Sequence, residues 1–408
     1  MATAVAVDRA SAVIAPRARQ PSAGRPPGSR GRIDRLRRLA WRHDVSFEES
    51  RRGSNVNSTE DTVREAFMLQ AKACAERGSP LTGILCRSLG RTLDRSTEIG
   101  RRVLDWPGRP DARGDSVPLR LAGGLHALVR RGRVPRLVAL YPPNSLPSDE
   151  TVEYALAEVL TDAECDLLPW LDHPPQTNEL MRSAPLMAGL LVIAARNELP
   201  FALYEVGASA GLVLVLDRYR HSLGRTSAGD ASAPLRIAPA WEGASPPRTG
   251  VRVLRRQGSD IAPLDVTNPA DRERLLAYVW ADQADRLARV EAAIRIAAAD
   301  PPRLDRAEAA RWTEAAIEPA PEVGVTRVLM HAVALQYAPE ETQARIAAHA
   351  ERVGTAARSD APFAWLRFEA DPDYADQGSL RLTLWPGGTE RVLALGDTHG
   401  ESVRWMCD

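Results

Sequence analysis

Residues 203–212 read L-Y-E-V-G-A-S-A-G-L, and this stretch decides how the carboxy-terminal half of the chain is interpreted. The apolar run from Ala202 to Val206 predicts a buried strand, and we expect Gly211 to Tyr219 to form a helix. A strand that passes into a helix through a Gly-rich turn is typical of α/β domains that bind a ligand at that turn.

The alternation of strand-like and helical runs continues over residues 199–408 and predicts a parallel sheet. Further strands are expected at Val251–Gln257, Arg303–Asp305, Val325–Ala332, Phe363–Glu369, Leu380–Trp385 and Arg391–Leu395, and helices at Asp271–Ala299 and Glu340–Val353. The Gly-rich stretch from Gly224 to Gly250 is expected to be an inserted loop. The link at residues 386–389, P-G-G-T, is short enough to require an antiparallel hairpin. The predicted fold class is α/β, with a doubly wound, mostly parallel seven-stranded sheet and a C-terminal antiparallel hairpin, preceded by a helical region.

The amino-terminal half has a different composition. Residues 1–54 are rich in Arg, Pro, Ala, Gly and Ser, so we expect a disordered tail. Such a tail fits a simple extension, an organelle-type presequence or a basic arm. Residues 55–198 are expected to be mainly helical, with apolar residues at helical spacing. The expected helices are Val63–Glu76, Leu81–Leu93, Leu119–Arg131, Val152–Leu160 and Leu180–Asn197.

Composition excludes several classes of function. The chain has 53 basic and 53 acidic residues and only 5% aromatic residues, so no nucleic-acid partner is expected. The four cysteines form no C-x-x-C pair, so no metal site is expected, and scattered thiols suit a reducing compartment. The longest apolar stretch, Ala184 to Ala195, is too short to span a bilayer. Without a convincing secretory signal, we expect a cytoplasmic protein with no membrane association.

The Gly-rich turn itself suggests a binding site for a nucleoside-type cofactor. Gly207 permits a backbone turn closed to other side chains, Ser209 is small enough for a ligand to approach, and Gly211 lets a helix start close to the strand. The amide groups at the start of that helix would face an anion. The turn resembles the E/D-x-G-x-G-x-G motif of class I methyltransferases, with Ser209 in place of the middle Gly. The resemblance implies S-adenosylmethionine as cofactor, its carboxylate at the helix start and its ammonium group at Glu205. The other reading is a tight turn without a ligand.

Further candidates follow the ends of the later strands, where ligands bind in this kind of sheet. Asp260 is placed to hold ribose hydroxyls, or to cap a turn. Glu308 follows the third strand, where methyltransferases often carry an acidic residue near the adenine. His331 is a candidate base, or a hydrogen-bonded structural residue, and Tyr337 is expected to line the substrate pocket.

Several stretches together resemble DUF2332, a family without an established activity. Besides the Gly-rich turn they are Q-T-N-E at 176–179 with Arg182, G-S-D-I-A-P-L-D at 258–265, A-Y-V-W-A-D-Q at 277–283, H-A-V-A-L-Q-Y at 331–337 and L-W-P-G-G at 384–388. The resemblance covers about residues 60–405 and supports the architecture rather than a reaction. The polar cluster at 176–179 is expected either to cover the cofactor pocket or to cap the next helix through Thr177 or Asn178.

Three functions remain open on the sequence. The first is a methyltransferase that acts on a small molecule or a protein side chain. The second is a serine hydrolase, because residues 207–211 also satisfy G-x-S-x-G. Ser209 would then be the nucleophile, His399 the base, and Asp360 or Asp371 the residue that orients it. The third is a ligand-binding module without catalysis.

Overall fold

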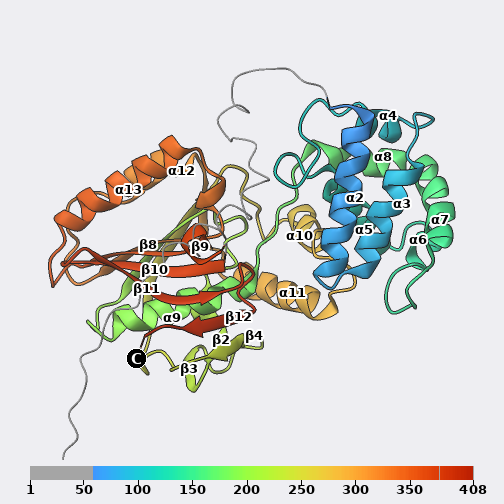
Figure 1. Ribbon diagram of the computed structural model, residues 1–408. Coiled ribbons are helices and arrows are strands. Elements are labelled where there is room, and N and C mark those ends of the chain that lie inside the picture. The colour runs from blue at the N-terminus through green and yellow to red at the C-terminus, as the bar shows by residue number, and fades with distance from the viewer. Residues whose placement is uncertain (1–57, 376, 408) are drawn as a thin grey trace, which may run out of the picture. The chain divides into compact units, whose positions relative to one another are not determined.

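The computed structural model describes residues 58–375 and 377–407, so the expected tail at residues 1–54 lies outside the described residues. Residues 56–408 belong to one compact unit. Within residues 58–200 of that unit the structure has helices and turns but no strand. The helices are α2 (Glu60–Glu76), α3 (Pro80–Thr92), α4 (Glu98–Leu104), α5 (Val117–Arg130), α6 (Pro135–Val138), α7 (Asp149–Asp162), α8 (Glu164–Leu167) and α9 (Ser183–Ala194). They occupy the stretch of the chain in which helices were predicted (Figure 1).

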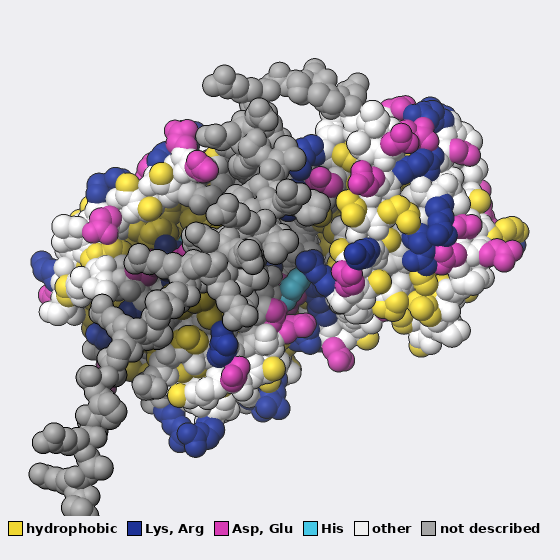
Figure 2. All heavy atoms as spheres, in the orientation of Figure 1, with side chains coloured by type: hydrophobic (Ala, Val, Ile, Leu, Met, Phe, Trp, Pro, Cys, Tyr) yellow, Lys and Arg dark blue, Asp and Glu magenta, His cyan; other side chains and the backbone are white. Residues whose placement is uncertain are grey.

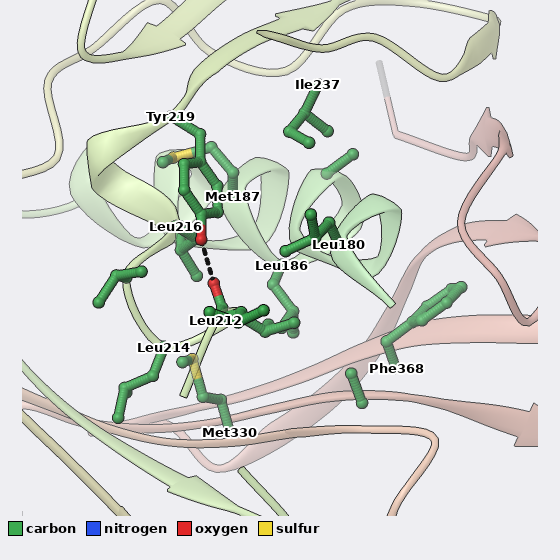
Figure 3. Packing of buried hydrophobic residues seen from close by; sticks show 14 of the residues in the cluster. Leu180, Leu186, Met187, Leu212, Leu214, Leu216, Tyr219, Ile237, Met330 and Phe368 are labelled. Carbon is green, nitrogen blue, oxygen red and sulfur yellow. Dashed lines mark hydrogen bonds between the residues drawn. The ribbon is translucent and has the colours of Figure 1, made fainter. Parts of the chain in front are cut away.

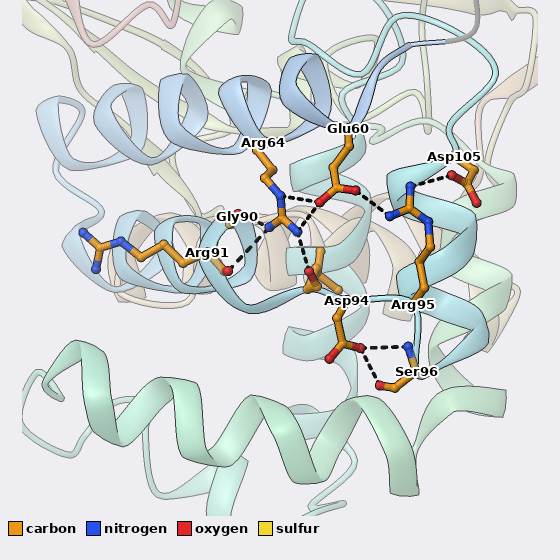
Figure 4. Close-up of polar contacts among 9 residues, drawn as sticks. Glu60, Arg64, Gly90, Arg91, Asp94, Arg95, Ser96 and Asp105 are labelled. Atoms are coloured by element: carbon orange, nitrogen blue, oxygen red, sulfur yellow. Dashed lines mark hydrogen bonds and ion pairs between the residues drawn. The ribbon is translucent and has the colours of Figure 1, made fainter.

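Local hydrogen bonds explain where these helices begin and end. Thr59 caps α2, because its side chain accepts a hydrogen bond from the amide of Thr62. At the end of α3, the guanidinium of Arg64 donates to the carbonyl groups of Gly90 and Leu93, both at 2.7 Å (Figure 4). These carbonyl groups have no partner within the helix, so the arginine stabilises the helix end. Apolar side chains from α2 to α8 then form one buried core.

The main sheet has nine strands in the order β5-β12-β11-β10-β9-β8-β1-β6-β7. The strands are β1 (Phe201–Val206), β5 (Ala240–Glu242), β6 (Val253–Asp260), β7 (Arg303–Arg306), β8 (Thr326–Ala332), β9 (Phe363–Asp371), β10 (Gln377–Trp385), β11 (Thr389–Gly396) and β12 (Ser402–Trp405). All seven predicted strands are present. The predicted number was too small because two short strands, β5 and β12, extend the sheet at one edge.

Five parallel strands contain the point where the direction of winding changes. From the central β1, the chain proceeds outward to β6 and β7 on one side, and later to β8 and β9 on the other. The switch point therefore lies between β1 and β8, at their carboxyl ends. The strands β10 and β11 are antiparallel, which confirms the predicted hairpin.

Helices cover both faces of this sheet (Figure 1). On one face, α12 (Ala309–Ala316) and α13 (Glu340–Thr355) pack on apolar side chains such as Tyr204 and Leu329. On the other face, α9 and the segment after β1 pack on side chains such as Leu203 and Met330. Alternate residues of a strand point to opposite faces, so β1 contributes to both cores and is buried throughout.

The predicted helix at Gly211–Tyr219 is absent, and this is the main correction to the expected fold. A series of turns follows β1 and ends in a short 3-10 helix, η4 (Leu216–Arg218). Ser209 and Gly211 have φ values of 53° and 71°, which an α-helix does not accommodate. The leucines that follow are buried, and the hydroxyl of Tyr219 donates to the carbonyl of Leu212 at 2.6 Å (Figure 3).

Two further expectations were wrong in detail. The stretch Gly224–Gly250 contains β-structure: β3 (Thr226–Gly229) and β4 (Arg236–Ile237) pair with β2 (Arg220–Leu223), and β5 joins the main sheet. The long helix expected at 271–299 is two helices, α10 (Pro269–Ala277) and α11 (Ala284–Ala299). In the gap between them, the ring of Tyr278 lies where a side chain at Gly123 of α5 would be, so the break fits the contact with the helical region.

The surface is consistent with the balanced composition. Figure 2 shows acidic and basic side chains interspersed over the helical region on the face that it presents. Within the described part of the chain, the structure has no helix that is both long and apolar enough to cross a membrane.

Candidate functional site

A cavity of about 670 Å³ lies at the carboxyl ends of β1, β6, β7 and β8. This is the switch point of the sheet, where open α/β sheets bind ligands, and the volume suits a small molecule. Four predicted site residues meet at this cavity: Gly207, Ser209, Asp260 and Glu308. Tyr337 also lines it, and its side chain is largely exposed. The structure thus brings together residues that are far apart in the sequence.

The backbone is strained on both sides of the switch point. Ser209 follows β1 with a φ of 53°, and Val333 follows β8 with a φ of 51°. A left-handed conformation is unusual for a β-branched residue such as Val333, and such strain is often found at functional sites. Gly207 has a φ of 69°, and a Cβ atom there would lie 2.4 Å from the Cβ of Ala334. Glycine is therefore required for this close approach of the two segments.

Asp260 connects three segments around the cavity. Its Oδ2 atom accepts a hydrogen bond from the Ser209 amide at 2.9 Å, and its Oδ1 atom accepts one from the Ala262 amide at 2.9 Å. The side-chain amide of Gln176 donates to the same Oδ1 at 3.4 Å and to the Ala262 carbonyl at 2.7 Å. Asp260 therefore does cap a turn. It also holds the Gly-rich turn in place at the cavity.

Three polar side-chain atoms near this turn have no hydrogen-bond partner in the described part of the chain. Among the described residues, Oε1 of Gln176 and the hydroxyl groups of Ser209 and Ser259 are buried without a hydrogen bond, and all three side chains line the cavity. Buried polar groups nearly always have partners, so a cluster of exceptions indicates a place for a polar ligand or water.

Glu308 lies at the cavity but also caps α12. Its two carboxylate oxygens accept hydrogen bonds from the amides of Ala310 and Arg311, both at 2.9 Å, and Thr342 donates to Oε1 at 3.0 Å. Burial alone would raise the pKa of Glu308, but these hydrogen bonds outweigh that effect and lower it. Glu308 therefore stays ionised and is held in one position.

Two residues of the Gly-rich motif do not reach the cavity. Gly211 packs against the start of β7, because a Cβ atom there would lie 2.6 Å from the ring of Pro302. Glu205 is buried in β1 and is not among the cavity-lining residues. Burial raises the pKa of Glu205 well above its usual range, and the nearby Asp260 carboxylate raises it further. A neutral, buried carboxyl group does not fit the expected partner of an ammonium group.

His331 is not among the residues that line this cavity. It is buried, and its Nε2 atom accepts a hydrogen bond from Nε1 of Trp365 at 3.1 Å. The proton is therefore on Nδ1, which donates to Glu369 at 2.6 Å. Burial would raise the pKa of Glu369, but the hydrogen bond from His331 outweighs it and the pKa falls. Both ring nitrogens are thus used within the protein.

Within the described part of the chain, no side-chain hydrogen bond joins the residues of the serine hydrolase hypothesis. Asp371 binds Ser379 and Arg381, and Asp360 binds Arg358. His399 instead lies near Glu179, with Nδ1 4.0 Å from Oε2. The hydroxyl of Ser209 has no hydrogen-bond partner among the described residues. No strand precedes β1 in the described residues, whereas a nucleophile elbow is expected after several strands.

The polar cluster at residues 176–179 has both of its expected roles, but through different residues. Gln176 covers the cavity, and Oδ1 of Asn178 accepts a hydrogen bond from the amide of Leu212 at 2.8 Å. The cap of the following helical turn is Glu179, which accepts from the amide of Met181 at 3.2 Å, rather than Thr177 or Asn178. Gln176 and Arg182 also line the cavity, but they precede the first strand, so the pattern of strand ends does not reveal them. Both residues belong to the stretches of sequence that resemble DUF2332, and this was the only signal that indicated them.

Fold and site together define an α/β protein with a large, mostly parallel sheet and a ligand-sized cavity at the carboxyl ends of its central strands. The chain belongs to a family described as an uncharacterized protein conserved in bacteria, DUF2332, whose model matches residues 64–405. Neither the curated proteins nor the solved structures contain a match to this chain. Within the described residues, no group of three or more His, Cys, Asp or Glu side chains is arranged to hold a metal ion.

Proposed function

We propose that the switch-point cavity binds S-adenosylmethionine and that the protein is a methyltransferase-like enzyme. The observation that carries the proposal is the convergence of a Gly-rich turn and two acidic residues on one cavity. The turn follows β1, Asp260 ends β6, and Glu308 follows β7. This is the arrangement that a nucleoside requires in a doubly wound sheet.

The residues present fit the adenosine half of this cofactor. Asp260 accepts three hydrogen bonds from its neighbours, and a carboxylate has about four acceptor positions, so it can still accept from a ribose hydroxyl. The unpaired Oε1 of Gln176 is a second acceptor. Apolar side chains of Ala307, Leu335 and Ala338 supply walls for a flat base.

The amino-acid half must be held differently from the sequence-based expectation. Neither a helix start nor an ionised Glu205 is available after β1. Instead, the unpaired hydroxyl groups of Ser209 and Ser259 lie at the turn and offer hydrogen bonds to a polar group. The cavity therefore fits the nucleoside well, and the amino-acid half of the cofactor would be held by these two hydroxyl groups.

The chemistry requires little of the protein beyond positioning. The bound cofactor supplies an electrophilic methyl group, and transfer is a direct displacement by the acceptor. The protein gains most by holding both molecules in line and excluding water. A residue such as His331, which is committed to structural hydrogen bonds, is not needed for this step.

Calorimetric titration of the full chain with S-adenosylmethionine and S-adenosylhomocysteine tests the proposal. Both should bind, and Ala338→Phe, which fills the cavity, should abolish binding. Ala348→Phe places the same side chain on an exposed position of α13 outside the cavity, so it should bind like the wild type. Absence of binding to the wild type contradicts the proposal. If a fluorophosphonate probe then labels Ser209, the hydrolase hypothesis replaces it.

A further inference from the structure

A second cavity, of about 490 Å³, adjoins the first one. It lies within the compact unit of residues 56–408 and is lined by α5, the segment between α10 and α11, and loops of the α/β part. The two cavities share part of their walls, namely Pro174, Pro175, Thr177, Arg182, Val333 and Tyr337. A molecule in the second cavity therefore lies next to one in the first.

The charge of this second cavity is one-sided. Arg77, Arg182 and Arg286 line it, whereas none of its lining residues, all of them described, is Asp or Glu. Arg286 is neutralised from behind by the buried Glu179, with Nε 2.8 Å from Oε2. His399 also lies beside Glu179. The cavity thus presents excess positive charge to whatever occupies it.

Arg182 is the most informative of these cations. Its Nε atom donates to the carbonyl of Thr398 at 2.9 Å and its Nη1 atom to that of Ala332 at 3.4 Å. No ion pair with Arg182 is formed by the carboxylates that the structure describes, although the side chain is largely buried. Glu179 and Glu369 lie near enough to act on Arg182 but form no ion pair with it, so an anion bound in the cavity would offset the cost of burying this charge.

The rest of the lining suits an apolar or aromatic body. Leu85, Leu119, Tyr278 and Trp280 supply apolar surface. The hydroxyl of Tyr141 is buried in this wall without a hydrogen-bond partner among the described residues, which is a second sign that a polar group of a ligand is accommodated there. The combination of arginine side chains and aromatic walls is typical of sites for small organic acids.

We propose that the second cavity binds a small organic carboxylate with an apolar or aromatic body, and that Arg182 pairs with the carboxylate. The role of this molecule as methyl acceptor rests on the proposed function. Its binding to the second cavity does not depend on that function. The shared wall places Arg182 and Val333 between the two ligands, so the arginine would anchor the acceptor beside the donor cavity.

Titration of the full chain with benzoate and phenylacetate, and with the neutral benzamide and phenylacetamide, tests this inference. At least one acid should bind, and its amide should bind much more weakly. Arg182→Gln should weaken binding of the acid about tenfold to a hundredfold, the value of a hydrogen bond to a charged group. Arg77→Gln is the control, because this exposed arginine should contribute little.

A second variant keeps the test decisive if Arg182→Gln does not fold. Leu119→Trp fills the second cavity but not the first, so it should abolish binding of the acid and leave S-adenosylhomocysteine binding unchanged. The inference fails if neither acid binds, if acid and amide bind equally, or if Arg182→Gln weakens only S-adenosylhomocysteine. If the acid binds through Arg182 while S-adenosylhomocysteine does not bind, the proposed function fails and this inference stands.

Discussion

Replacement of Gly207 by Ala should disrupt the turn that forms the candidate site and lower the free energy of unfolding. The structure separates this loss of stability into a backbone part and a packing part. The left-handed backbone, with φ at 69°, costs an alanine about 1–2 kcal/mol. The new Cβ atom would also lie 2.4 Å from the Cβ of Ala334, and such overpacking costs about 1–3 kcal/mol. We therefore expect Gly207→Ala to lower the free energy of unfolding by about 2–5 kcal/mol in urea denaturation.

A matched control separates the two parts. Gly132 has a φ of 66° but no atom within 4 Å of its added Cβ position, so Gly132→Ala should show only the backbone cost. Ala334→Gly removes the Cβ atom with which the new side chain collides. The double variant Gly207→Ala with Ala334→Gly should therefore recover most of the stability by which Gly207→Ala falls below Gly132→Ala. If Gly207→Ala costs no more than Gly132→Ala, or if Ala334→Gly does not relieve it, the two segments do not meet at the switch point as described.

Four further predictions concern buried ionisable residues, and the first three are measured by urea denaturation at several pH values. Burial raises the pKa of Glu205, so its contribution to stability is present below pH 4.5 and is lost as the pH rises. Glu205→Gln should therefore become more stable relative to the wild type above pH 4.5. Equal dependence of the two unfolding free energies on pH would contradict this. Glu179 has the opposite shift, from 4.5 to about 2, so Glu179→Gln should cost about 3 kcal/mol at neutral pH, with the cost fading as the pH falls below 4.5. Burial lowers the pKa of His126 from 6.5 to about 4, so the wild type should lose stability as the pH falls from 6.5 to 4. In His126→Gln this loss of stability should be smaller by up to about 3 kcal/mol. His331→Gln should reduce stability by about 1–3 kcal/mol but leave S-adenosylhomocysteine binding unchanged, and selective loss of binding would restore His331 to the site.

The order of elements was predictable because buried parallel strands leave a strong signal. All residues of β1 and β8 are buried, and each strand has a short apolar stretch, Phe201–Tyr204 in β1 and Val328–Met330 in β8. The acidic residues Asp260 and Glu308 could be found because they lie at or just after the ends of the next two predicted strands, although β6 and β7 are only partly buried. Their meeting at one cavity is a consequence of parallel strands, whose carboxyl ends share one edge of the sheet.

Other features depend on contacts that a linear pattern does not contain. The edge strands β5 and β12 are three and four residues long, and their pairing brings together segments far apart in the sequence. The run from Leu212 to Leu216 is buried on every side, so its periodicity does not distinguish a helix from an irregular segment. The role of His331 was equally hidden, because Trp365 and Glu369 come from the neighbouring strand β9.

A crystal structure of the full chain with S-adenosylhomocysteine would test the proposed cofactor site most directly. We expect the adenosine to lie at the carboxyl ends of β1, β6 and β7, with a ribose hydroxyl within hydrogen-bond distance of the Asp260 carboxylate. The base should lie against Ala338. A ligand that binds elsewhere, or a cavity that stays free of it at saturating concentration, would contradict the proposal.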